Sequence, residues 1–196
     1  MKKWILPLIL SVAAPLSAGS LTQGERDFAM SNLHASRKQF LDSITDLSEA
    51  QWKFKPAPDR WSIAEVAEHL ILTEGAVFNI ATEKLMKSEA VTGQPPATRE
   101  QDEEVLARLR DRSKKATASE SITPTGRWPT PEASATAFKK DRDRSIAYIA
   151  GTQDDLRAHR GKTLDAYQYF LLLAGHTERH VAQINEVKAD PNYPRK

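Results

Sequence analysis

Residues 167–187 read YQYFLLLAGHTERHVAQINEV, and this stretch decides the fold class. It lacks proline, and its apolar residues recur every three or four positions, which predicts a long amphipathic helix. His176 and His180 are four residues apart, so they lie about 40° apart on one face of that helix. The same face carries Tyr169, Leu173, Gln183 and Val187. We therefore expect both histidines to point into the protein interior.

The remainder of the chain after residue 20 has the same helical periodicity. No segment alternates apolar and polar residues over the length of a strand, so we expect an all-α protein. Four long helices are expected, at about residues 22–47, 62–87, 130–156 and 163–189, and a short charged surface helix at about 99–115. The segments 48–60 and 116–130 contain helix breakers and are expected to be loops. This pattern is typical of a four-helix bundle, here with a short extra helix in the long middle connection.

Two of these helices have clear start signals. Ser62 is followed three residues later by Glu65, which is the spacing of a capping box. Thr130 precedes Pro131 and Glu132, so a capping residue is followed by proline at the first helical position and by an acid in the first turn. The sequence therefore predicts helix starts at residues 62 and 130.

The composition fits one globular domain. The chain has 196 residues, of which 40% are hydrophobic and 28% charged, so we expect one core of ordinary size and no second domain. It has no cysteine, which excludes disulfides, thiolate metal sites and cysteine nucleophiles. Its 28 Lys and Arg residues nearly balance 26 Asp and Glu residues, and the signs alternate along the chain. Nucleic-acid binding requires a clustered basic face, so no nucleic-acid partner is expected.

The first twenty residues, MKKWILPLILSVAAPLSAGS, have the order of a secretory signal peptide. Two lysines precede an apolar run from Trp4 to Leu16, and small residues close the segment. The apolar run is shorter than the ~20 residues of a membrane span. We expect cleavage after Gly19 or Ala18, with an uncleaved N-terminal anchor as the alternative. Residues 21–196 would then form an exported domain, periplasmic or extracellular, with no stable membrane insertion after cleavage.

The histidine pair on its own permits two interpretations. Two imidazoles spaced i and i+4 on an interior face can bind one metal ion, or they can be hydrogen-bonded core residues. The pair is not the zinc-protease motif, in which a glutamate directly follows the first histidine. Here Glu178 lies two residues from each histidine and points to the opposite side of the helix.

His69 is a third candidate ligand. It lies in WSIAEVAEHL, residues 61–70, at the edge of the buried stripe of the second long helix. Taken alone, it is interpreted as a packed helix histidine. Two facing helices of a bundle can nevertheless bring one ligand and two ligands to a shared point, and three neutral imidazoles leave open positions for water or substrate. His34 and His159 have charged neighbours and are expected at the surface.

Two segments together resemble the DinB-like (damage-inducible) superfamily. They are LSEAQWKFKPAPDRWSIAEVAEHLILTE, residues 47–74, and AGHTERHVAQINEV, residues 174–187. In that family a loop of the Asp-Arg-Trp-Ser type enters a helix with one histidine. The last helix carries a His-x-x-x-His pair, often followed by glutamine three residues on. The matching elements here are Asp59-Arg60-Trp61-Ser62, His69, His176, His180 and Gln183.

The resemblance covers residues 22–189 and implies a four-helix bundle that binds one divalent metal through His69, His176 and His180. It also implies that a homodimer is common. The metals of such folds vary among zinc, nickel, manganese and iron, and imidazole ligands suit several of these ions. Characterised relatives include transferases and isomerases that use low-molecular-weight thiols in the cytoplasm. The expected export of this chain departs from that pattern.

Several polar residues are candidates for the surroundings of a metal. Tyr169 and Gln183 are expected to orient ligands or water, or else to be buried polar groups with partners. Glu65 is a candidate general base, although its position equally fits the capping box. Glu68 is expected to face solvent. Trp52 and Trp61 are expected to pack against the end of the bundle or to wall a pocket.

Three hypotheses for the function remain open. The first is a metal-dependent enzyme that acts on a small molecule, either a hydrolase or a group transferase such as a thiol-dependent one. The second is a non-catalytic, exported metal-binding or stress-associated bundle. The third is a bundle with three hydrogen-bonded histidines and no metal. An open coordination position beside a pocket favours the first hypothesis, and a fourth protein ligand favours the second.

Overall fold

The computed structural model describes residues 19–113 and 117–195, and within these two ranges the secondary structure is helical without a β-sheet. The four long helices are α1 (Gln23–Ile44), α3 (Ile63–Asn79), α5 (Pro131–Gly151) and α6 (Ala166–Lys188). The short ones are α2 (Glu49–Lys53), α4 (Arg99–Arg110), the π-helix η1 (Ile80–Leu85) and the 3-10 helix η2 (Glu120–Ile122). The all-α prediction is confirmed. The predicted signal peptide lies, up to residue 18, outside the described residues.

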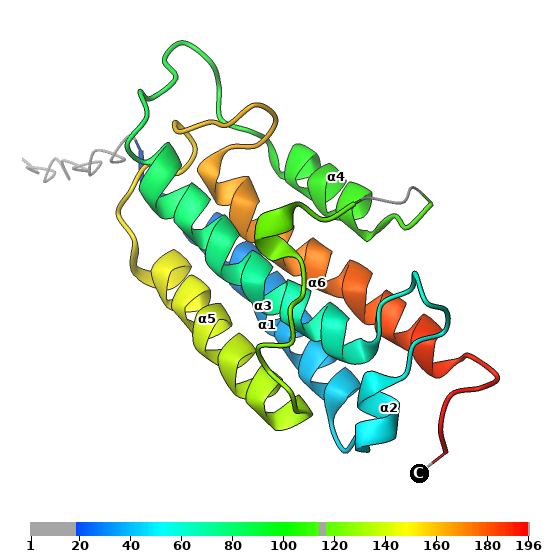
Figure 1. The fold of residues 1–196 in the computed structure, drawn as a ribbon. Helices are drawn as coiled ribbons and strands as arrows, with labels where there is room; N and C mark the ends of the chain where they lie inside the picture. Colours follow the sequence, from blue (N-terminus) through cyan, green and yellow to red (C-terminus); the bar gives the residue numbers. More distant parts are fainter. Residues whose placement is uncertain (1–18, 114–116, 196) are drawn as a thin grey trace, which may run out of the picture.

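The long helices pack as a four-helix bundle (Figure 1). Helices α1 and α3 each contact both α5 and α6, so α5 and α6 occupy opposite corners of the bundle. Helix α4 lies along α6 on the outside, and the segment with η2 runs past α3 (Figure 1). In the described part of the chain, no helix is sufficiently long and apolar to span a bilayer.

Apolar side chains from the long helices fill the bundle in two clusters. One cluster lies around the starts of α1 and α6 and includes Leu33, Tyr167 and Phe170, which are fully buried. The other lies toward the opposite end and includes Phe40 and Phe138, whose ring centroids are 4.4 Å apart. Burial of these side chains is the main favourable contribution to folding, because each fully buried large apolar side chain contributes about 1.5–3 kcal/mol.

Side-chain caps start all six α-helices in the described part of the chain. Ser62 Oγ accepts a hydrogen bond from the Glu65 amide, and the Glu65 carboxylate accepts one from the Ser62 amide, as the capping-box spacing predicts. The same reciprocal pair is present at α1, α2, α4 and α6. Thr130 caps α5, and Pro131 is its first residue. Both predicted helix starts are therefore confirmed.

Two element boundaries differ from the sequence-based expectation. The segment 48–60 was expected to be a loop, but Ser48 and Gln51 form a capping box that starts the short helix α2. Its Trp52 is 1% exposed and donates from Nε1 to the Pro129 carbonyl at 3.0 Å. Helix α3 is regular only to Asn79 and continues as the π-helix η1.

The helix expected at 99–115 lies at the surface as predicted, but it is shorter than expected and one of its faces is buried. Helix α4 ends at Arg110, and it buries Asp102, Val105 and Leu106 against its neighbours. It packs along α6, where Gly175 faces it. A Cβ atom at Gly175 would lie 2.9 Å from Leu109 Cβ, so the absence of a side chain permits this close approach of the two helices.

Gly175→Ala is expected to destabilise the protein by about 1–3 kcal/mol, because the added methyl group overpacks the α4–α6 contact. Leu109 Cβ is fixed to the α4 backbone, so the helix itself must shift. Urea unfolding monitored by circular dichroism measures the change. Gly75→Ala in α3 is the matched control, since a Cβ atom there would have no neighbour within 4 Å and alanine favours a helix by about 1 kcal/mol. Equal stabilisation by both substitutions would contradict the predicted steric conflict.

A fully buried guanidinium connects the four long helices. Arg142 of α5 is 0% exposed, and its Nε lies 3.1 Å from each carboxylate oxygen of Glu74 in α3. Its Nη1 donates to the Leu33 carbonyl of α1 at 2.9 Å. Its Nη2 donates to Thr177 Oγ1 of α6 at 2.8 Å and to the Leu173 carbonyl at 3.2 Å. The guanidinium therefore satisfies polar groups from three helices at once.

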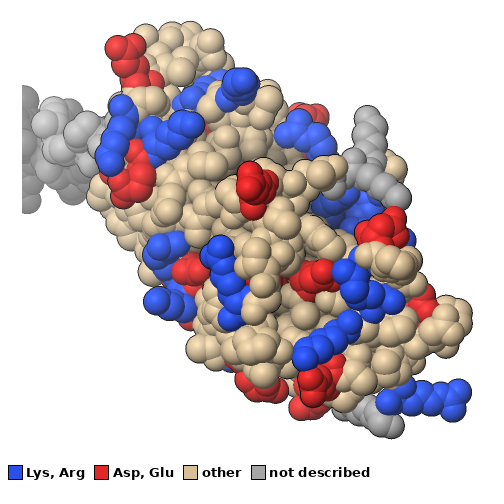
Figure 2. Space-filling view, in the orientation of Figure 1, with Lys and Arg blue, Asp and Glu red and all other residues tan. Residues whose placement is uncertain are grey.

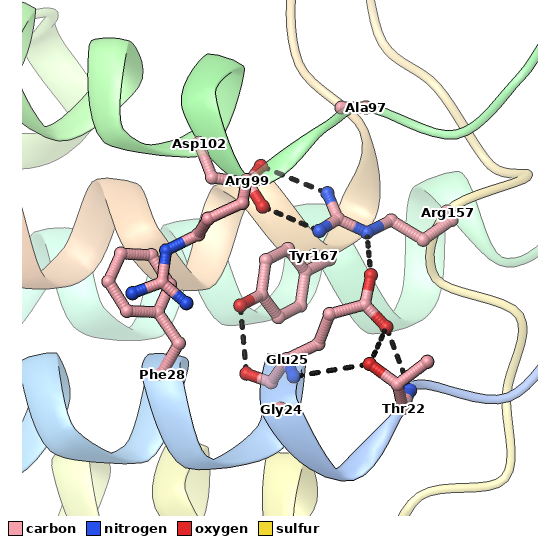
Figure 3. A pocket seen from close by; sticks show the side chains of 9 residues that line it. All are labelled: Thr22, Gly24, Glu25, Phe28, Ala97, Arg99, Asp102, Arg157 and Tyr167. Atoms are coloured by element: carbon pink, nitrogen blue, oxygen red, sulfur yellow. Dashed lines mark hydrogen bonds and ion pairs between the residues drawn. The ribbon is translucent and has the colours of Figure 1, made fainter.

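A second buried arginine lies where α1, α4 and α6 begin (Figure 3). Arg157 contacts Asp102 at 2.6 and 3.0 Å, Asp165 at 3.1 Å and Glu25 at 2.7 Å. Its guanidinium also lies 3.9 Å from the centre of the Tyr167 ring. A cavity of about 230 Å³ lies beside this cluster. The cluster fixes three helix starts relative to one another.

Lys and Arg side chains alternate with Asp and Glu side chains over the face of the molecule drawn in Figure 2. Several exposed side chains of the protein form pairs four residues apart on one helix, such as Lys38 with Asp42 and Arg99 with Glu103. Exposed pairs of this kind contribute only about 0.3–0.5 kcal/mol each. The exposed pairs therefore contribute little to stability.

Candidate metal centre

Three histidine side chains from two helices converge on one point of the bundle. His69 comes from α3, and His176 and His180 come from α6. The Nε2 atom of His176 lies 3.3 Å from that of His69 and 3.2 Å from that of His180. One ligand nitrogen from each ring can be chosen so that all three lie within 4.8 Å of one another. His69 and His180 are buried, and His176 is partly exposed.

Local sequence determines how the rings meet. Helix α3 packs against α6, so the buried stripe of α3 places His69 against the α6 face that carries the pair. The i, i+4 spacing places His176 and His180 on consecutive turns, with ring centroids 4.4 Å apart. The histidine face of α6 points inward, as its sequence pattern predicts.

The two nitrogen–nitrogen distances through His176 match those around a divalent cation. Zinc–nitrogen bonds of about 2.0–2.1 Å at tetrahedral angles place two ligand nitrogens ~3.3 Å apart. The two Nε2–Nε2 distances through His176, 3.3 and 3.2 Å, have this value. Three imidazoles are also the donor set of catalytic metal sites in which one position remains open. The residues therefore fit the group that the sequence resemblance implies.

Hydrogen bonds to Nδ1 leave the Nε2 lone pairs of two rings available. His69 Nδ1 lies 2.9 Å from the Ile122 carbonyl oxygen, which accepts only, so Nδ1 carries the proton. His180 Nδ1 lies 2.8 Å from Gln183 Oε1 and donates to that oxygen. In metal sites such partners fix the tautomer and orientation of a ligating histidine.

Burial keeps the three imidazoles neutral. Desolvation, together with the nearby His69, lowers the pKa of His180 to about 3. Desolvation also holds the pKa of His176 well below its ordinary value. It lowers the pKa of His69 as well, although the hydrogen bond to Ile122 acts in the opposite direction. Because neutral imidazole is the form that binds metals, the three rings are ready for a cation at neutral pH.

Trp61 covers the cluster from the loop before α3. Its ring centroid lies 4.9 Å from that of His69 and 6.4 Å from that of His180, nearly parallel to the latter. Of the two tryptophans considered from the sequence, Trp61 therefore lies at the histidines. Trp52 packs in the core at the end of the bundle.

The structure does not bring two of the proposed neighbours to the histidines. Glu65 uses one carboxylate oxygen for the Ser62 amide and the other for Lys55 at 2.8 Å, so it is engaged at the start of α3. Tyr169 lies two turns before the histidine pair, with its hydroxyl against Gly161. Its position seven residues before His176 put it on the same face but at the other end of the helix.

Of the other residues considered from the sequence, one lies at the histidine cluster and two histidines lie outside it. Gln183 lies at the site, as the hydrogen bond to His180 shows. His34 is exposed and His159 is partly exposed, and neither belongs to the cluster. Sequence reasoning missed the Ile122 carbonyl, because every residue has a carbonyl and no letter of the sequence marks this one. It also assigned Glu68 to the solvent, whereas Glu68 is 2% exposed.

A four-helix bundle with an inward-facing cluster of three histidines defines a class of metal-binding proteins. The chain belongs to one family of this class, the DinB superfamily, whose model matches residues 32–184. The predicted resemblance is therefore confirmed. Among solved structures, the chain is similar to YfiT from Bacillus subtilis, with a TM-score of 0.57 and 14% sequence identity over 89% of this chain and 92% of that one. No curated protein matches the chain.

YfiT is described as a probable metal-dependent hydrolase with an unusual four-helix bundle topology. At 14% identity the likeness shows the fold alone. It agrees with the bundle that the helical pattern predicted.

Proposed function

We propose that this protein is a metal-dependent enzyme, a hydrolase or a group transferase, that holds one divalent cation between His69, His176 and His180. The observation that carries this proposal is the convergence of three neutral imidazoles, with Nε2 atoms 3.2 and 3.3 Å apart. The description of YfiT as a probable metal-dependent hydrolase supports the hydrolase alternative. Zinc, nickel, manganese and iron are the candidate ions, because imidazole suits each of them.

Different residues would have different roles at such a site. The three histidines bind, while the Ile122 carbonyl and Gln183 hold two of the rings in the ligating tautomer. The Trp61 ring covers one side of the histidines and limits the access of water. A divalent cation with an open position supplies Lewis acidity, which polarises a carbonyl group or activates a water or thiol nucleophile of a small-molecule substrate.

Metal content tests the proposal directly. The purified domain, incubated with zinc, nickel or manganese and then desalted, is expected to retain one ion per chain by inductively coupled plasma mass spectrometry. The His176→Ala/His180→Ala double variant is expected to retain none, because one remaining imidazole cannot hold the ion. The matched control is His34→Ala/His159→Ala, which removes the two histidines outside the cluster and should retain the ion. A wild-type domain without metal under all three conditions would overturn the proposal.

A non-catalytic metal-binding bundle is the second candidate function. The observation that favours it is the engagement of nearby acids elsewhere: Glu65 caps α3, and Glu68 accepts hydrogen bonds from a loop. Binding of azide to the cobalt-substituted protein separates the two functions. A change in the visible spectrum indicates an open coordination position and favours the enzyme. An unchanged spectrum indicates a closed site and favours the binding protein.

Export belongs to the proposal and rests on the signal-peptide pattern of residues 1–20. Mass spectrometry of the protein from the periplasm or culture medium is expected to show a mature chain that begins at Gly19 or Ser20. Recovery of the full-length chain from the cytoplasm would contradict export. A homodimer stays a prediction from the family resemblance.

A further inference from the structure

Glu68 directly precedes His69 in the sequence, and its carboxylate is buried. Its side chain is 3% exposed, although it belongs to a charged residue type that is seldom fully buried. It accepts hydrogen bonds from the amides of Thr125 at 2.9 Å, Gly126 at 2.6 Å and Arg127 at 3.2 Å. The Thr125 hydroxyl donates a fourth at 3.2 Å.

These donors come from one loop, and the backbone conformation of the loop lets them converge. Gly126 has φ +88°, in the left-handed region that favours glycine. When one residue of a turn has this left-handed conformation, the successive backbone amides around it point to one side and form a concave site for an anion. A carboxylate suits the site because it only accepts hydrogen bonds and has about four acceptor positions. Bonds to a charged acceptor are also roughly twice as strong as neutral ones.

The same loop supplies the partner of His69. The Ile122 carbonyl that accepts from His69 Nδ1 lies three residues before Thr125, in the turn formed by η2. Most of this loop is exposed, including Thr125, Gly126 and Arg127 themselves. Farther along the loop, Trp128 packs against the core and Pro129 accepts from Trp52, while residues 125–127 are joined to α3 by the four hydrogen bonds to Glu68. Two adjacent residues of α3 thus contact the loop at two points.

We propose that Glu68 is a positioning residue, which fixes the loop so that the Ile122 carbonyl holds His69 in the tautomer with Nε2 free for a cation. Glu68 does not touch the cation or the substrate; it acts through the Thr125–Arg127 amides and the Ile122 carbonyl. The consequence for metal binding rests on the function proposed above. The consequence for the His69 tautomer is a property of the metal-free chain.

The first test is the tautomer of His69 in metal-free protein, measured by long-range nitrogen–proton correlation spectra at pH 7.5. The wild-type ring is expected in one state, with the proton on Nδ1. Glu68→Ala is expected to populate both tautomers, because the loop no longer holds the carbonyl in place. Glu68→Gln keeps the volume and one acceptor oxygen, so an intermediate effect is expected in a variant with little risk of misfolding.

The second test is zinc affinity, measured by competition with a chelator. Loss of an outer partner of a metal ligand weakens binding by about 10–100-fold, and we expect about tenfold for Glu68→Ala. Glu65→Ala is the matched control: it removes another glutamate of α3 and its cap at a cost of about 1 kcal/mol, but it does not contact the loop. It should keep the wild-type tautomer and zinc affinity.

The outcomes separate the two proposals. A Glu68→Ala variant with the wild-type tautomer and zinc affinity would overturn the positioning role, even if the variant were less stable. A wild-type protein that binds no zinc, nickel or manganese would overturn the proposed function. The tautomer spectra of the same metal-free sample would still decide the role of Glu68.

Discussion

Arg142→Leu is expected to lower the free energy of unfolding by about 3–5 kcal/mol, because it leaves the buried Glu74 carboxylate without its charge partner. Glu74 is 1% exposed, so water cannot replace the guanidinium. The substitution also removes the donors for the Leu33 carbonyl and Thr177 Oγ1, on two other helices. Each lost hydrogen bond to a buried group adds to the cost.

Urea unfolding of the Arg142 variant measures this effect, with Lys140→Leu as the control. Lys140 lies on the same helix but is exposed, so its substitution should change stability by no more than about 0.5 kcal/mol. The double variant Arg142→Leu/Glu74→Leu removes both charges and should recover part of the loss. If the free energy of unfolding of the single variant Arg142→Leu were within about 1 kcal/mol of the wild-type value, the Arg142–Glu74 pair would contribute little to stability.

Arg157→Ala is expected to cost a similar amount, about 3–5 kcal/mol at pH 7. Arg157 is the partner of two buried carboxylates, Asp102 and Asp165, which are 1% and 2% exposed. Asp165 is also the N-cap of α6, and Glu25 belongs to the capping box of α1. The loss is therefore expected to loosen the starts of both helices as well as the charge cluster.

The cost of Arg157→Ala should shrink as the pH falls. Burial raises the pKa of Asp165 above its ordinary value even while Arg157 acts to lower it. Without Arg157 the folded-state pKa rises further, so the folded protein binds a proton at a higher pH than the unfolded chain does. Acidification through this pKa therefore stabilises the folded variant relative to its unfolded state.

Urea unfolding at pH 7 and pH 5 tests the sign of this effect, as the difference between wild type and variant at each pH. Arg160→Ala is the control, since its partly exposed side chain contacts only Gln94 and the Pro95 carbonyl among the described hydrogen bonds. If the loss of unfolding free energy in Arg157→Ala were larger at pH 5 than at pH 7, the result would contradict this prediction.

Most of the fold could be predicted because it is encoded locally. The long helices follow from the period of their apolar residues, and their starts follow from capping residues such as Ser62 and Thr130. The three-histidine cluster was predictable for a related reason. The α6 pair shares a face by spacing alone, and the family resemblance identified His69 as the third member.

The parts that could not be predicted depend on contacts between distant residues. Helix α4 has a charged sequence, and its packing on α6 became evident only with the Gly175 contact. Glu68 was expected to face solvent because the loop that surrounds it comes almost sixty residues later in the chain. Tyr169 shares a helical face with His176 but lies two turns away, because two residues on the same face can be far apart along the helix axis.

The positions of the three histidines in the chain give a bound ion a further effect. The chain has no cysteine, so it has no disulfide to connect distant segments. A cation shared by His69 and His176 joins residues 107 positions apart. A covalent cross-link around a loop of about 100 residues removes ~4.7 kcal/mol of chain entropy from the denatured state. The ion would serve as a removable cross-link, and the stability of the domain would then depend on how much metal its surroundings provide.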